Sequence, residues 1–289
     1  MDENEESEYL EGIRLDVDDL IIDANGHTID ARGKTRIFCC TIAVEIRNAM
    51  LKNGVGAIYN FGGVLKISKT TLSDNAVKVA GGAINNNWGK LIIEDSVLSD
   101  NSSQCHGGAI FNVNGEARII NSELSHNIAI NDGGAIFNGA KLTVEDSILS
   151  HNTANGSGGV IYDNRGEINI RDSSLSNNIS NGIFGGGALH KNRGTLNMAD
   201  SVFSHNVANG DGGAIFNIDG ELKISKSKLH NNTSEANGGA IYDWGVLSIT
   251  DSDLCDNTAK KGGGAIFTKN KPELNLKDCI LKNNQPEDM

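Results

Sequence analysis

Carboxylates recur in this chain at distances that could bring them together around a metal ion. Asp146, Asp172 and Asp200 each stand directly before a Ser, at intervals of 26 and 28 residues. If the three lie one above another, they repel each other or share a Ca²⁺. The alternative is that Asp is favoured at a turn between two strands, where water screens its charge. We expect the turn.

Two histidines offer a second set of metal ligands. His126 and His151 occupy equivalent places in LSHN segments, and Asp100 holds the same place one unit earlier. Imidazole and carboxylate ligands on one line would suit Zn²⁺ or Ni²⁺. The column continues with Asn, His and Asp, as a solvated turn position permits. We therefore predict no metal, no cofactor and no catalytic residue, and the chain has no GxSxG, HExxH or P-loop motif.

An internal repeat sets the positions of all these residues. The second Gly of a GGAI-like motif recurs about every 26 residues, at Gly56, Gly82, Gly108, Gly134, Gly159, Gly187, Gly213, Gly239 and Gly264. The Asn of an LSxN-like segment keeps the same period, at Asn75, Asn101, Asn127, Asn152, Asn178, Asn206, Asn232, Asn257 and Asn284. The repeat is therefore one supersecondary unit, copied nine times.

Each unit has the pattern of strands and turns. The runs GAIFN, KLTVED and SILSHN are short, partly alternating and separated by Gly, Asn or Asp, which favours strands over helices. Three strands cannot bury a core alone, but each can pair with its copy in the next unit. We predict an all-β, single-stranded parallel β-helix, or solenoid, with three strands per rung. The crossover rule predicts that it is right-handed, and the Asn column should form a buried ladder of amides.

The repeat also divides the chain. We predict an acidic N-terminal tail at 1–12, capping rungs at 13–54, a nine-rung β-helix at 55–284 and a C-terminal tail at 285–289.

A line of aromatic residues is the candidate binding surface. The residue after GGAI is aromatic in seven units, namely Tyr59, Phe111, Phe137, Tyr162, Phe216, Tyr242 and Phe267. If the Ile of the motif faces inward, alternation turns this line outward, where it could bind sugars or a partner's apolar surface. If Ala and the aromatic residue face inward, the line is an internal stack without a ligand. The sequence leaves both arrangements open.

Charge and composition limit the partners. The net charge is −12, which repels nucleic acid, and the five scattered Cys are expected to be free thiols. No stretch is long and uncharged enough to span a bilayer, and the start, MDENEESEYLEG, has no signal-peptide pattern. The oligomeric state is open.

The GGAI and LSxN elements, preceded by DLIIDANGHTIDARGKTRIF, resemble the adhesin-like proteins of methanogenic archaea, and also chlamydial polymorphic outer-membrane proteins. Within the LSxN column, only Phe203–Asn206 matches the chlamydial FxxN signature and Leu replaces the Phe in the other units, so the archaeal resemblance is closer. It implies a right-handed β-helix at the cell surface or outside the cell. We therefore predict a non-enzymatic adhesin module for glycan or protein ligands. The sequence leaves open whether the chain is a fragment of a longer surface protein. The alternative is a pectate-lyase-like lyase or glycoside hydrolase, which rests on fold analogy.

Overall fold

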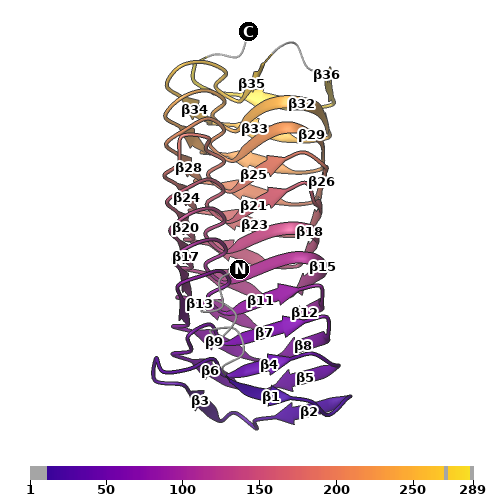
Figure 1. Ribbon diagram of the computed structural model, residues 1–289. Helices are drawn as coiled ribbons and strands as arrows, with labels where there is room; N and C mark the ends of the chain where they lie inside the picture. Colours follow the sequence, from indigo (N-terminus) through magenta and orange to yellow (C-terminus); the bar gives the residue numbers. More distant parts are fainter. Residues whose placement is uncertain (1–11, 270–272, 287–289) are drawn as a thin grey trace.

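Over its described residues, the protein is a column of stacked coils built from strands and turns without helices (Figure 1). The computed structural model describes residues 12–269 and 273–286. Most of the expected acidic tail at 1–12 and the last three residues of the C-terminal tail lie outside the described residues. All strand pairs are parallel, and paired residues are about one repeat apart in sequence. The prediction of a parallel β-solenoid is confirmed.

Three parallel sheets run along the column. The first, called here the long sheet, contains β1 (Ile13–Leu15), β2 (Leu20–Asp23), β4 (Phe38–Cys40), β5 (Val44–Arg47), β7 (Ile58–Phe61), β8 (Val64–Ser68), β11 (Ile84–Asn87), β12 (Lys90–Glu94), β15 (Ile110–Ile120), β18 (Ile136–Glu145), β21 (Ile161–Asn164), β22 (Glu167–Arg171), β25 (Leu189–Asn192), β26 (Thr195–Ala199), β29 (Ile215–Ser225), β32 (Ile241–Thr250), β35 (Ile266–Thr268) and β36 (Glu273–Lys277).

The second sheet has one strand per coil and eleven strands in all: β3 (Thr28–Asp30), β6 (Met50–Lys52), β9 (Thr71–Ser73), β13 (Val97–Ser99), β16 (Glu123–Ser125), β19 (Ile148–Ser150), β23 (Ser174–Ser176), β27 (Val202–Ser204), β30 (Lys228–His230), β33 (Asp253–Cys255) and β37 (Ile280–Lys282). The third consists of eight two-residue strands: β10 (Ala76–Val77), β14 (Ser102–Ser103), β17 (Ile128–Ala129), β20 (Thr153–Ala154), β24 (Ile179–Ser180), β28 (Val207–Ala208), β31 (Thr233–Ser234) and β34 (Thr258–Ala259).

The three sheets divide the repeat differently from the three runs that the sequence suggested. GAIFN and KLTVE both belong to the long sheet, and in β15, β18, β29 and β32 they form one unbroken strand. The third sheet comes instead from the two residues after LSxN. Those residues are too few to show a periodicity, which is why the pattern does not reveal them.

The core is a set of apolar columns. In β18 Ile136, Leu142 and Val144 are fully buried, and Leu149 of β19 faces them from the second sheet. Ala135, before the strand, is buried as well. Both the Ala and the Ile of GGAI therefore point inward, which places the next residue on the outer side.

The Asn column is a buried amide ladder, as predicted. Asn152 has no solvent exposure, and its Oδ1 accepts bonds from the backbone N–H and the Nδ2 of Asn127, each at 3.0 Å. Its own Nδ2 donates to Asn178 Oδ1 at 3.2 Å and to the Leu124 carbonyl at 2.9 Å. Each amide therefore satisfies the backbone at a corner of the coil as well as the next amide.

Replacing Asn152 by Leu should lower the free energy of unfolding by about 1–3 kcal/mol, because the groups of Asn127, Asn178 and Leu124 lose partners inside the core. Urea denaturation would measure the loss. Asn155→Ala, which changes an exposed Asn three residues later, should shift the free energy by less than about 0.5 kcal/mol. Equal midpoints for the two variants would contradict the ladder's role.

The GG pair is required by how closely the coils approach. Gly133 has φ +70°, a conformation that side chains other than those of Asn and Asp rarely adopt. A Cβ on Gly134 would lie 2.1 Å from the carbonyl oxygen of Gly159 in the next coil. The first Gly therefore serves the turn and the second serves the stacking.

Candidate functional site

The Asp column is a turn position. Asp146, Asp172 and Asp200 are exposed and have φ of 49–50°, the left-handed conformation that Asp and Asn tolerate. Lys69, Asn121 and Lys226 hold the same conformation in other coils. No cluster of three potential metal ligands occurs in residues 12–269 and 273–286.

The histidine column is a second left-handed turn. His126 and His151 both have φ of 57° and are exposed. Their rings stack with centroids 5.0 Å apart and planes 7° apart. Asp100 has the same turn conformation one coil below. This stacking shows that the spacing of the two rings matches the spacing of the coils. Within the described residues, neither His belongs to a group of three potential metal ligands.

The aromatic line lies on the outer side of the long sheet. From Phe111 to Phe267 neighbouring rings, with His190 among them, have centroids 4.7–5.4 Å apart, and every pair is stacked except the tilted pair of His190 and Phe216. This spacing falls within the range of favourable aromatic pairs. The faces of each ring therefore pack against the neighbouring rings, and mainly the ring edges are exposed to solvent. Both arrangements left open by the sequence are partly realised, because the line is external and also a stack.

Exposure varies along this line. Phe111, Phe137 and Tyr162 are partly exposed, whereas Phe216 and Tyr242 are only 3% and 5% exposed. Tyr59 and Phe267 are also partly exposed and lie near the two ends. His190 is buried, and burial lowers its pKa to about 3. That ring is therefore neutral in the fold and packs as an aromatic residue.

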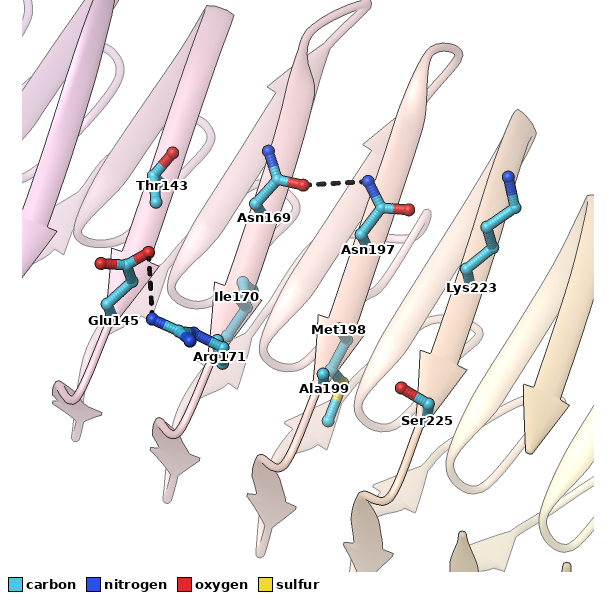
Figure 2. Close-up of a pocket in the computed structure, with 10 residues that line it drawn as sticks. All are labelled: Thr143, Glu145, Asn169, Ile170, Arg171, Asn197, Met198, Ala199, Lys223 and Ser225. Carbon is cyan, nitrogen blue, oxygen red and sulfur yellow. Dashed lines mark hydrogen bonds and ion pairs between the residues drawn. The ribbon is translucent and has the colours of Figure 1, made fainter. Parts of the chain in front are cut away.

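A shallow groove with a mixed polar and apolar lining lies farther along the same strands (Figure 2). It has a volume of about 310 Å³ and crosses β18, β22, β26 and β29. Asn197 Nδ2 donates to Asn169 Oδ1 at 2.9 Å, which joins two neighbouring coils. Ala199 is flanked in register by Arg171 and Ser225, so two small side chains beside a long one leave the hollow.

Charged groups surround these two amides. Arg171 lies 3.5 Å from the carboxylate of Glu145, and Lys223 stands beside Asn197 in register. Figure 2 shows these side chains on the outer face, with Ile170 and Met198 on the side toward the core. Amides, a guanidinium and a hydroxyl in one shallow groove can donate and accept several hydrogen bonds. The repeat pattern does not predict these residues as a site, because the groove arises where neighbouring units carry different side chains at equivalent positions.

A second buried ladder lies beneath the aromatic line, formed by the residue after each aromatic. Asn86 Nδ2 donates to Asn112 Oδ1, and Asn112 Nδ2 to Asn138 Oδ1, both at 2.7 Å. In the next two coils the column holds Asp163 and Lys191, an ion pair with no solvent exposure. Alternation from the inward Ile gives the signal for this ladder, since a residue two positions later also faces inward.

Burial shifts both members of this ion pair toward their neutral forms. It raises the pKa of Asp163, although Lys191 and the amide of Asn138 act in the opposite direction. It lowers the pKa of Lys191, opposed by the charge of Asp163. The Lys191 ammonium also donates to the Gly166 carbonyl at 2.6 Å, and Asp163 Oδ2 accepts from the Gly166 N–H at 3.0 Å. The pair is enclosed in the column and out of reach of a ligand.

The fold and these ladders define a repetitive parallel β-solenoid. Three segments, residues 95–113, 200–218 and 251–269, match the model of the Chlamydia polymorphic membrane protein repeat. Each runs from the left-handed Asp through the ladder Asn to the GGAI strand. Comparison with curated proteins and with solved structures gave no match. The described part of the chain has no helix able to cross a membrane.

Proposed function

We propose that this chain is a surface-associated, non-enzymatic solenoid module that attaches to glycans along the outer face of its long sheet. The observation that carries the proposal is the groove across four strands, with the amides of Asn169 and Asn197 joined by a hydrogen bond within it. A shallow groove that spans coils suits a chain of sugars, because successive residues of the ligand meet successive coils. The polymorphic membrane protein repeat found in three segments supports a place at a membrane or cell surface.

The polar side chains of the groove suit sugars. Amides and hydroxyls that both donate and accept can match sugar hydroxyls, and Arg171 adds a planar donor. The aromatic line, our candidate from sequence, offers mainly ring edges beside this groove. Its part in binding stays a prediction, which the variant Phe111→Ser, Phe137→Ser, Tyr162→Ser would test.

Replacing Asn169 and Asn197 together by Ala should weaken glycan binding about tenfold, since each lost hydrogen bond contributes roughly 0.5–1.5 kcal/mol. Glycan-array screening of the parent, followed by biolayer interferometry on its best ligand, would measure this. The matched control replaces Asn155 and Asn181 by Ala, because those exposed amides also join neighbouring coils, at 3.2 Å, outside the groove. An equal loss in both double variants, or no glycan bound by the parent, would remove the groove from the account.

Incubation with acidic polysaccharides and Ca²⁺ should yield no new reducing ends and no unsaturated product. A lyase or hydrolase needs an acid and a base placed about a scissile bond, and Glu145 in the groove is paired to Arg171. Detection of either product would contradict the proposed attachment function and indicate that the protein is a lyase or hydrolase.

A further inference from the structure

Two neighbouring coils carry the same exposed turn, Asn-Arg-Gly. It stands at residues 164–166 and 192–194, and in each coil it joins the two strands of the long sheet. The two turns lie one above the other, because Asn164 pairs with Asn192 in register and the Arg165 N–H donates to the Asn192 carbonyl at 2.7 Å. The backbones of the two arginines are therefore one coil spacing, about 4.8 Å, apart along the column.

The backbone at both arginines is left-handed. Arg165 has φ of 68° and Arg193 has φ of 62°, in a region where Gly and Asn are the favoured residues. Gly62 and Asn114 hold the equivalent place in two other coils, with φ of 75° and 57°. The shape of the turn therefore does not select Arg, and a bulky residue held in this conformation is a feature that clusters at binding sites.

Arg165 carries a positive charge that this corner of the column does not match. Within the part of the chain that the structure describes, its exposed side chain has neither a hydrogen bond nor an ion pair. Three nearby carboxylates already have cations, namely Asp163 with Lys191, Glu167 with Lys141 and Asp219 with Arg193. The last pair is loose, because its atoms are 3.7 Å apart and both side chains are more than half exposed.

The surroundings of Arg165 provide room and further donors. The coil below makes the same corner through Gly139 and Ala140, with one residue fewer, so no long side chain lies beneath Arg165. Asn164 Oδ1 accepts from Asn192 Nδ2 at 3.3 Å, which leaves the exposed Asn164 amide nitrogen as a donor. Two guanidinium groups and an amide N–H thus converge on one exposed corner, a set that suits an anion with several oxygens.

We propose that the paired Asn-Arg-Gly turns bind the anionic group, a carboxylate or a sulfate ester, of an acidic sugar. This inference rests on the glycan attachment proposed above and names the class of glycan. Arg165 binds two oxygens of the group side by side, and Arg193 supplies a second guanidinium one coil above. The net charge of −12 repels an acidic sugar from the molecule as a whole, so binding depends on this pair.

The turns and the groove lie on the same two coils. Asn169 follows Arg165 by four residues, and Asn197 follows Arg193 by four, which corresponds to about 13 Å along the strands. A single glycan can therefore place its anionic group at the turns and neutral hydroxyls in the groove.

Biolayer interferometry of the full chain with paired oligosaccharides would test the site. One pair is a uronic acid oligosaccharide and its methyl ester, and the other is a sulfated oligosaccharide and its desulfated form. In at least one pair the parent should bind the acidic member about tenfold or more tightly than the neutral one. The pair that shows the preference distinguishes carboxylate from sulfate, and the preference should weaken as the NaCl concentration is raised.

Replacing Arg165 and Arg193 together by Asn should abolish this preference and leave binding of the neutral member unchanged. Asn suits the left-handed turn, as Asn114 shows, so the thermal midpoint should stay the same or rise. Asp219→Asn should increase the affinity for the acidic member several-fold, because Arg193 then has no competing carboxylate.

The matched control is Lys69→Asn with Lys226→Asn, which removes two positive charges at exposed left-handed turns where Asn121 holds the same place in another coil. This variant should keep the preference for the acidic member. The anionic site is overturned, and glycan attachment stands, if the parent binds both members of each pair equally, if the Arg variant keeps the preference, if the control loses it equally, or if Asp219→Asn weakens acidic binding. If the parent binds no oligosaccharide at all, both proposals fall.

Discussion

Replacing Lys191 by Met should lower the free energy of unfolding at neutral pH by about 3–5 kcal/mol, the usual cost of leaving one member of a buried ion pair uncompensated. Asp163 would then stand in the core between Asn138 and the Met side chain. A Met of similar length fills the space of the Lys stem, so the loss reports the charge. Urea denaturation would give the value.

The matched variant is Lys191→Met with Asp163→Asn, which should regain most of the loss. An Asn at 163 can donate to the Gly166 carbonyl, as Asn217 donates to the Gly220 carbonyl at 2.9 Å. If the double variant is no more stable than Lys191→Met alone, the unpaired carboxylate is not the cause of the loss.

The single variant should also recover stability in acid. Burial raises the pKa of Asp163, and removal of Lys191 takes away a charge that lowers it. A carboxyl with a raised pKa in the fold is protonated there more readily than in the unfolded chain. The Lys191→Met variant therefore loses stability as the pH rises from about 4, the pKa of an unperturbed Asp, through the pKa of Asp163 in the folded variant. The deficit should be smaller at about pH 4 than at pH 7, whereas the double variant lacks this dependence.

Gly134→Ala should lower the free energy of unfolding by about 3 kcal/mol, the upper end for overpacking a tight core. The new Cβ would meet the Gly159 carbonyl oxygen at 2.1 Å and the backbone carbon of Thr153 at 2.7 Å. Both are backbone atoms, so two coils must move apart and the bonds between them lengthen. Thermal or urea unfolding would measure the loss.

The control for this change is Gly262→Ala, because a Cβ there has no neighbour closer than 3.6 Å and φ is not in the left-handed region. We expect unchanged stability or a gain of up to about 1 kcal/mol. Equal effects at Gly134 and Gly262 would show that the close approach of coils does not select Gly.

Much of the architecture could be predicted from sequence because the ladders repeat a single residue. Asn152 stands in a column of Asn, and such a column is only stable if it is stacked and satisfied. The second ladder was missed because its members change from Asn to Asp163 and Lys191, residues that usually mark a solvated face. The two-residue strands of the third sheet were missed because they are too short to carry a pattern.

The candidate site was harder to predict for a physical reason. The aromatic line is a true column, but its chemistry depends on how far apart the rings lie, and coil spacing makes them stack face to face. The groove arises from departures from the repeat, such as Ala199 between Arg171 and Ser225. Composition and period describe what the units share, so features made by differences between units appear only when the coils are superposed.

Each coil bonds only to the coils directly above and below. A gene segment that encodes one whole coil can therefore be duplicated or deleted without changing the contacts inside the other coils. Recombination that adds or removes one unit, such as the 26 residues that separate Ile84 from its partner Ile110, leaves every remaining column in register. The result is a longer or shorter column with the same cross-section. A lineage can therefore change the reach of this molecule in steps of about 4.8 Å without inventing a new fold.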